Sequence, residues 1–183
     1  MRYNDGDYIR RYKEFGEFPH IHDDIFAISR SLIGQNVIDL GCCTGLLTLR
    51  LATRNNLVIG VEANAAFLDE CISASNVKYR NIRVSADTLQ DFAGLVDKYH
   101  IQTIYARRVL PELQETGGAE LVADFIKLSY DHNVERFVIE GRKSNKNAVN
   151  PLSSVQKEVE AMRGFYAVEK SYNECRIMKH VEL

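Results

Sequence analysis

The chain has 183 residues, of which 45% are hydrophobic and 26% charged, and its formal net charge at pH 7 is −2. This length fits a single domain with a substantial core, and the near-neutral charge argues against a broad electrostatic footprint on duplex DNA. No stretch approaches the roughly 20 apolar residues of a membrane span, and the polar start is not a secretory signal, so we expect a cytoplasmic protein without membrane association.

The predicted elements alternate between strands and helices along the chain. Apolar residues at helical or strand spacing, bounded by turn residues, define them. In chain order they are helix 8–15, helix 22–32, strand 36–40, helix 45–54, strand 57–61, helix 65–74, strand 82–84, helix 88–99, strand 102–106, helix 119–132, strand 137–140, helix 151–162 and a hairpin of strands 165–172 and 175–181. This alternation predicts an α/β fold with a doubly wound, mainly parallel sheet and right-handed crossovers.

Four cysteines, at positions 42, 43, 71 and 175, fit neither a disulfide framework nor a CxxC zinc site. We expect the adjacent Cys42 and Cys43 to be small buried residues in a reducing compartment rather than redox centres. His20 and His22 are two possible metal ligands without a nearby third, so no metal site is predicted.

A glycine-bearing turn follows the first predicted strand. Residues 37–49 read VIDLGCCTGLLTL, and Glu62 ends the next strand, 17 residues after Gly45. Gly41 and Gly45 permit a sharp turn and close approach of a ligand, and a helix beginning near Gly45 directs free N–H groups toward that ligand. A carboxylate at the position of Glu62 can accept hydrogen bonds from both hydroxyls of a ribose.

The turn lacks the G-x-G-x-x-G spacing of dinucleotide-binding proteins. It resembles the first motif of the class I, Rossmann-like S-adenosylmethionine-dependent methyltransferases, Asp/Glu-x-Gly-x-Gly-x-Gly. Asp39, Gly41 and Gly45 match that motif, and Cys43 stands at its middle glycine. The resemblance covers about residues 36–182 and implies seven strands, of which the last is antiparallel. We expect one domain, 1–183, with a helical cap or lid at 1–33 and a Rossmann-like core at 36–183.

The resemblance implies S-adenosylmethionine as cofactor and Asp87 as the partner of the adenine amine, with Ala86 leaving room for the ring. Each carboxylate also has a structural alternative: Asp87 as N-cap of the helix near Leu89, Asp39 as a cap of N–H groups in the turn, and Glu62 as a cap of the helix near Ala65. The expected cofactor-binding residues are Asp39, Gly41, Cys42, Cys43, Gly45, Glu62, Ala86 and Asp87.

In this family the segment after the fourth strand faces the transferred methyl group. Here it carries Arg107 and Arg108, without an Asn/Asp-Pro-Pro-Tyr/Phe or Pro-Cys signature. The arginines suit an anionic acceptor, or else one of them pairs with Glu112 or Glu140. The predicted cationic rim comprises Arg107, Arg108, Arg142, Lys143 and Lys146, and the candidate bases are Glu140, Glu112, His20 and His22.

These features predict S-adenosylmethionine-dependent methyl transfer to an anionic acceptor, with RNA or a nucleotide-like small molecule preferred over protein. Two alternatives stay open. The first is a non-catalytic module that binds S-adenosylmethionine or has a regulatory role on the same fold. The second is an NAD-dependent oxidoreductase, which the glycine spacing disfavours. The sequence does not indicate an oligomeric state.

Overall fold

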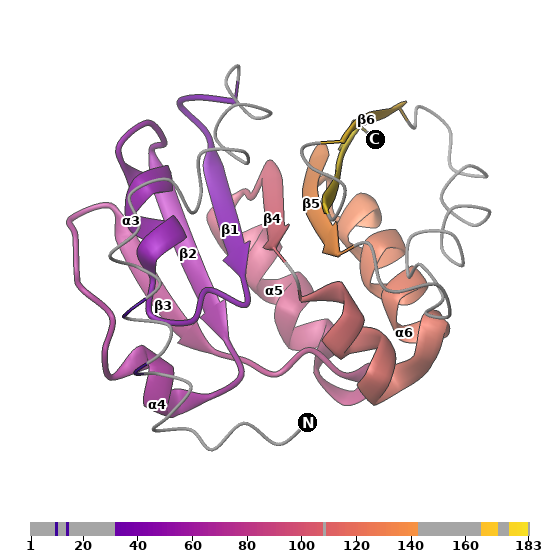
Figure 1. Cartoon of the computed structure of the whole chain (residues 1–183), viewed down its shortest axis with the longest axis horizontal. Helices are drawn as coiled ribbons and strands as arrows, with labels where there is room; N and C mark the ends of the chain where they lie inside the picture. Colours follow the sequence, from indigo (N-terminus) through magenta and orange to yellow (C-terminus); the bar gives the residue numbers. More distant parts are fainter. Residues whose placement is uncertain are drawn as a thin grey trace.

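The computed structural model describes residues 10, 14, 32–107, 109–142, 166–171 and 176–182. Five parallel strands lie next to one another in the order β3-β2-β1-β4-β5, with β3 at the edge of the sheet (Figure 1). On the β5 side the backbone of β7 pairs antiparallel with β5, and β6 pairs antiparallel with β7. The strands are β1 (Asn36–Leu40), β2 (Leu57–Glu62), β3 (Val77–Asn81), β4 (Thr103–Arg107), β5 (Arg136–Arg142), β6 (Tyr166–Ser171) and β7 (Arg176–Glu182).

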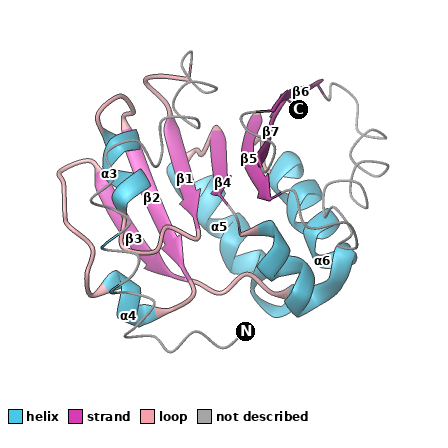
Figure 2. Ribbon diagram, in the orientation of Figure 1, coloured by secondary structure: helices cyan, strands magenta, loops and turns pink. Residues whose placement is uncertain are grey.

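Helices connect the parallel strands, as Figure 2 shows. They are α3 (Leu46–Ala52), α4 (Ala65–Leu68), the short 3-10 helix η1 (Ala86–Thr88), α5 (Leu89–Tyr99) and α6 (Leu110–Asp131). The strand order reverses between β1 and β4, which are neighbours in the sheet although β2 and β3 separate them in sequence. In open α/β sheets ligands bind beyond the carboxyl ends of the strands at such a reversal.

Alternate strand residues point into two separate apolar clusters. Ile38 aligns with Ile59 and Ile104 in the strand register, and the three pack in one cluster with Phe92 of α5 and Phe125 of α6. The Phe92 and Phe125 rings lie 4.9 Å apart between centroids. The intervening strand residues belong to the second cluster, together with side chains of α3: Val37, Val58, Tyr105, Val138, Leu47 and Leu51. The sheet is therefore covered on both faces, as a parallel sheet requires.

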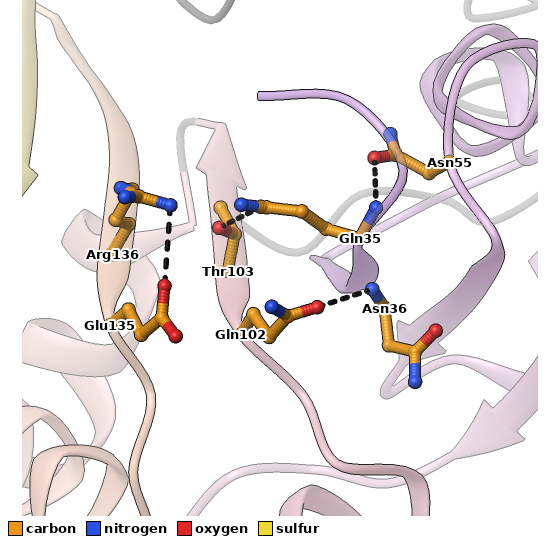
Figure 3. Close-up of polar contacts among 7 residues, drawn as sticks. All are labelled: Gln35, Asn36, Asn55, Gln102, Thr103, Glu135 and Arg136. Carbon is orange, nitrogen blue, oxygen red and sulfur yellow. Dashed lines mark hydrogen bonds and ion pairs between the residues drawn. The ribbon is translucent and has the colours of Figure 1, made fainter. Parts of the chain in front are cut away.

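Polar side chains tie the amino ends of β1 and β4 together (Figure 3). The Thr103 hydroxyl donates to Gln35 Oε1 at 2.6 Å, and the Asn36 backbone N–H donates to Gln102 Oε1 at 3.2 Å. The Gln35 N–H donates to Asn55 Oδ1 at 3.3 Å, after the end of α3. These contacts satisfy buried polar groups at the amino ends of the strands, at the opposite end of β1 from the glycine-bearing turn.

The α/β class and the central parallel sheet are confirmed, and β1 has the predicted bounds. The third strand was predicted at 82–84, which is wrong because β3 spans Val77–Asn81. Lys78 and Asn81 are exposed on this edge strand and give it a polar composition, whereas the apolar Ile82 and Val84 flank Arg83 in a segment that is not a strand. The helix predicted at 65–74 is also shorter, because α4 ends at Leu68.

The helix predicted at 119–132 corresponds to the second part of α6, whereas the first part of α6, which begins at Leu110, was not predicted. Pro111 lies in its first turn, where the missing N–H costs no hydrogen bond. Gly118, with φ 74° and ψ −176°, is not helical and divides α6 into two helical parts, so the glycine pair precedes the second part as predicted. The predicted lid at 1–33, apart from residues 10, 14, 32 and 33, and the helix at 151–162 lie outside the described residues.

No helix in the described part of the chain is long and apolar enough to cross a membrane.

Candidate functional site

The turn between β1 and α3 lies against the end of β2. Its Gly41 and Cys42 N–H groups both donate to the Val61 carbonyl, at 2.8 and 3.1 Å, and Gly45 N–H donates back to the Cys42 carbonyl at 2.9 Å. Three of its residues have left-handed backbone angles: Gly41 (φ 70°), Cys43 (φ 50°) and Gly45 (φ 80°). This conformation favours glycine, so Cys43 occupies the middle position under strain.

Glu62 connects the end of β2 to this turn. Its Oε2 accepts a hydrogen bond from Cys43 N–H at 3.0 Å, and its Oε1 accepts one from Asn64 N–H at 2.9 Å. The side chain is 9% exposed. Because an ionised carboxylate has about four acceptor positions, Glu62 keeps acceptor capacity for further donors while it holds the turn.

The alternative in which Glu62 caps the following helix is wrong. The Asn64 side chain caps α4 instead, with its Oδ1 accepting from Ala66 N–H at 3.0 Å.

Asp39, the other acidic residue of the motif, is 1% exposed. Its Oδ2 accepts a hydrogen bond from the Thr48 hydroxyl at 2.6 Å, which fixes α3 to the strand that precedes the turn. Burial raises the pKa of Asp39 to about 7, although the Thr48 hydroxyl and the positive charge of Arg107 act in the opposite direction. No sequence pattern points to Thr48, because its contact depends on how α3 packs on β1.

Neighbouring side chains fill the space that the two glycines of the turn leave. A Cβ at Gly41 would lie 3.0 Å from Val109 Cγ2, and a Cβ at Gly45 would collide with the Tyr79 hydroxyl. Tyr79 of β3 donates to the Ile72 carbonyl at 3.1 Å and also lies against Gly60, its partner in the β2–β3 register. A side chain at position 45 would therefore collide with Tyr79, whereas one at position 41 would only crowd Val109, and both positions have a positive φ that favours glycine.

Thr44 precedes Gly45 in the turn. Its hydroxyl is buried and has no hydrogen-bond partner among the described residues. The residue is 6% exposed. A buried hydroxyl without a partner is uncommon in folded proteins.

Ala86 and Asp87 lie in η1, and both are exposed. Ser85 is the N-cap of η1, and its N–H donates to the Thr88 hydroxyl at 2.9 Å. Thr88 is in turn the N-cap of α5, so the alternative role of Asp87 as that cap is wrong. The adenine-binding role of Ala86 and Asp87 stays a prediction.

The structure describes only some of the residues that were predicted to face the methyl acceptor. Arg107 ends β4, one residue beyond the position paired with Leu40 of β1, and is paired in register with Glu140 of β5. Glu112 lies in the first turn of α6, and Arg142 ends β5. The side chains of Glu112, Glu140 and Arg142, and residues Arg108, Lys143, Lys146, His20 and His22, lie outside the described part.

The described residues contain no group of three or more His, Cys, Asp or Glu side chains arranged to hold a metal ion. Cys42 is buried, as expected, whereas Cys43 is only partly buried.

No protein-family model matches the chain, and no curated protein matches it in sequence. Solved structures do match in fold. A SAM-dependent methyltransferase from Anabaena variabilis superposes with a TM-score of 0.64 at 12% identity, over 90% of this chain and 84% of that one. Magnesium protoporphyrin IX methyltransferase from Synechocystis, solved with bound SAM, gives 0.62 at 18% identity, over 100% of this chain and 86% of that one.

The bifunctional kinase-methyltransferase WbdD gives a TM-score of 0.64 at 14% identity, over 87% of this chain. The chain spans only 38% of that larger protein. The described sheet, its strand order and these neighbours show that the chain has the Rossmann-like fold of the S-adenosylmethionine-dependent methyltransferases. At these identities the likeness is one of fold, and activity is a separate question.

Proposed function

We propose that the chain binds S-adenosylmethionine at the carboxyl ends of β1 and β2. The observation that carries this proposal is the contact of Glu62 Oε2 with Cys43 N–H at 3.0 Å, which brings a carboxylate with spare acceptor positions to the glycine-bearing turn. A ribose diol offers two donors that match such a carboxylate. In a methyltransferase fold the carboxyl ends of these strands are the expected binding site.

The residues at the turn fit this cofactor. The Thr44 hydroxyl is buried without a partner among the described residues, which supports a polar ligand at the turn. Ala86 and Asp87 are exposed and thus accessible to an adenine ring. When bound, S-adenosylmethionine supplies an electrophilic methyl group on a sulfonium; the chain has to orient the donor and the acceptor and to manage the proton of the acceptor.

The proposed reaction is methyl transfer to an anionic acceptor, RNA or a nucleotide-like small molecule. Arg107 supports an anionic acceptor, because β4 ends there beside the turn and a guanidinium pairs well with phosphate or carboxylate. Arg108 is proposed to share this role. Glu140, next to Arg107 in the strand register, and Glu112 are the proposed general bases.

Three further expectations belong to the proposal. The complete domain is the seven-stranded methyltransferase sheet with a C-terminal antiparallel hairpin, which the pairing of β5 with β7 and of β7 with β6 supports. Residues 1–33 form a helical cap over the core. The protein works in the cytoplasm.

A thermal-shift titration tests the cofactor. A ligand that binds only the native state raises the unfolding midpoint, so S-adenosylhomocysteine is expected to raise it and NAD to leave it unchanged. The opposite result would favour an oxidoreductase.

Transfer of a tritiated methyl group to RNA, DNA, protein and metabolite fractions then tests the reaction. Label in the RNA or nucleotide fraction is expected. The charge reversal Arg107→Glu should reduce this transfer by a larger factor than it weakens cofactor binding, because the charge of Arg107 also acts on Asp39, whereas Lys127→Glu, on the exposed side of α6, should change neither. Cofactor binding without transfer to any fraction would favour the non-catalytic binding module.

A further inference from the structure

Two cysteines that are 29 residues apart in sequence meet beside the glycine-bearing turn. Cys71 Sγ lies 3.4 Å from the Cys43 carbonyl oxygen, and Cys42 Sγ lies 3.8 Å from the same oxygen. Both sulfur atoms therefore lie beside the same carbonyl oxygen. Cys71 lies after α4 and is held there by a further contact of its Sγ with the Phe67 carbonyl at 3.5 Å.

The two thiols differ in their access to solvent. Cys42 is 2% exposed, whereas Cys71 is only partly buried and precedes Ile72, which is 64% exposed. A small oxidant can therefore reach Cys71 more easily than Cys42. This arrangement is typical of a reactive thiol with a resolving thiol behind it.

The two thiols also differ in pKa, and the more exposed thiol has the lower one. The neighbouring Cys71 thiol and burial raise the pKa of the Cys42 thiol well above its usual range, so Cys42 stays protonated while Cys71 is reduced. The neighbouring Cys42 thiol lowers the pKa of the Cys71 thiol, although partial burial opposes this effect. Since the thiolate is the nucleophile, the accessible cysteine is also the one that is ready to react.

We propose that Cys71 and Cys42 form a hydroperoxide-reactive dithiol that oxidises to a disulfide. The Cys71 thiolate attacks the outer oxygen of the peroxide, the O–O bond breaks and hydroxide leaves, which gives a sulfenic acid at Cys71. The hydroxide takes the proton of the Cys42 thiol and becomes water, the Cys42 thiolate then attacks the sulfur of the sulfenic acid, the S–S bond forms, and the hydroxyl group leaves as hydroxide. The dithiol loses two electrons, and the peroxide gains them.

The disulfide would join the glycine-bearing turn to the segment between α4 and β3. That turn is the proposed cofactor site, but the oxidation itself does not depend on cofactor binding. Formation of the disulfide can therefore be tested independently of the proposed function. It also departs from the expectation that Cys42 is an inert buried residue.

Peptide mapping of the full chain tests the proposal directly. The protein is treated with hydrogen peroxide, free thiols are blocked with N-ethylmaleimide, and trypsin then separates the peptide of residues 31–50, with Cys42 and Cys43, from that of residues 55–78, with Cys71. A disulfide between these two peptides is expected, and dithiothreitol should reverse it. Absence of this link after peroxide treatment would overturn the proposal.

The adjacent cysteines supply a matched pair of variants. Cys43→Ser should form the linked peptide to within about twofold of the wild type, whereas Cys42→Ser should lose at least about tenfold. The reverse pattern would assign the disulfide to Cys43 and contradict the proposal.

Dimedone labelling of sulfenic acid gives an independent measurement. In Cys42→Ser the sulfenic acid at Cys71 has no resolving thiol, so dimedone should accumulate on residues 55–78. The variant Cys71→Ser changes a partly exposed residue and should show neither the linked peptide nor this adduct. Dimedone predominantly on Cys43 or Cys175 would identify a different reactive thiol and would also contradict the proposal.

Discussion

The carboxylate of Glu62 and the backbone N–H of Cys43 are joined by a hydrogen bond of 3.0 Å, between residues 19 apart in sequence. This bond connects the end of β2 to a turn in which Cys43 has φ 50°. The left-handed backbone at Cys43 therefore belongs to the same arrangement as the carboxylate. The strained backbone of Cys43 and the carboxylate of Glu62 therefore lie in the same candidate site.

The strain at Cys43 can be measured by comparing two small residues at this position. We expect Cys43→Gly to be more stable than Cys43→Ala by about 1 kcal/mol, because only glycine adopts a positive φ without a Cβ penalty. Urea unfolding of both variants gives the difference. An alanine variant as stable as the glycine variant would show that the turn does not hold this conformation in solution.

Asp39 gives the protein a specific dependence of stability on pH. Its pKa is about 7 in the folded state against 3.8 in the unfolded state. Between these values the folded chain keeps the proton and the unfolded chain loses it, so the contribution of Asp39 to stability falls as pH rises from about 4 to about 7 and is constant above. Each unit of pKa difference corresponds to about 1.4 kcal/mol.

The variant Asp39→Asn tests this dependence, since an amide oxygen can still accept the Thr48 hydroxyl but does not ionise. We expect the free energy of unfolding of the variant, relative to the wild type, to increase by a few kcal/mol across this pH range. Denaturant unfolding from pH 4 to pH 8 measures the difference. A difference that does not change with pH would contradict a raised pKa at Asp39.

Gly45 and Gly94 form a matched pair for glycine replacement. Gly45→Ala should destabilise the fold by about 2–4 kcal/mol, because the new Cβ would meet the Tyr79 hydroxyl and the residue has φ 80°. Gly94→Ala should stabilise it by about 0.5–1 kcal/mol, because Gly94 lies inside α5 and a Cβ there would meet nothing within 4 Å.

Thermal and urea unfolding measure both effects. Adding Tyr79→Phe to Gly45→Ala should recover part of the loss, since it removes the nearest atom. A Gly45→Ala variant that is no less stable than the wild type would mean that Tyr79 does not lie over the turn.

The sequence was most informative where local pattern and burial agree. Residues 37–40 of β1 are all buried, so an apolar run marks the strand, and the position of Glu62 followed from the spacing of strand and turn. It was least informative at β3, where Lys78 and Arg80 alternate with Tyr79 and the strand has no apolar run. A strand at the sheet edge keeps few buried side chains, so hydrophobicity alone misplaces it.

The contacts of Thr48 and Tyr79 could not be predicted from local pattern. Both arise from packing between elements: α3 on β1 for Thr48, and the β2–β3 register for Tyr79. One signal was present, because Gly60 inside a strand indicates the close approach of another group, and Tyr79 is that group. The sequence does not say which residue approaches.

Calorimetric titration with S-adenosylhomocysteine tests the central claim most directly. We predict one binding site per chain in the wild type, affinity at least about tenfold weaker in Glu62→Ala, and unchanged affinity in Asp124→Ala, which removes an exposed carboxylate on α6. Circular dichroism confirms that each variant is folded before titration. No binding by the folded wild type, or equal affinity in Glu62→Ala, would contradict the account.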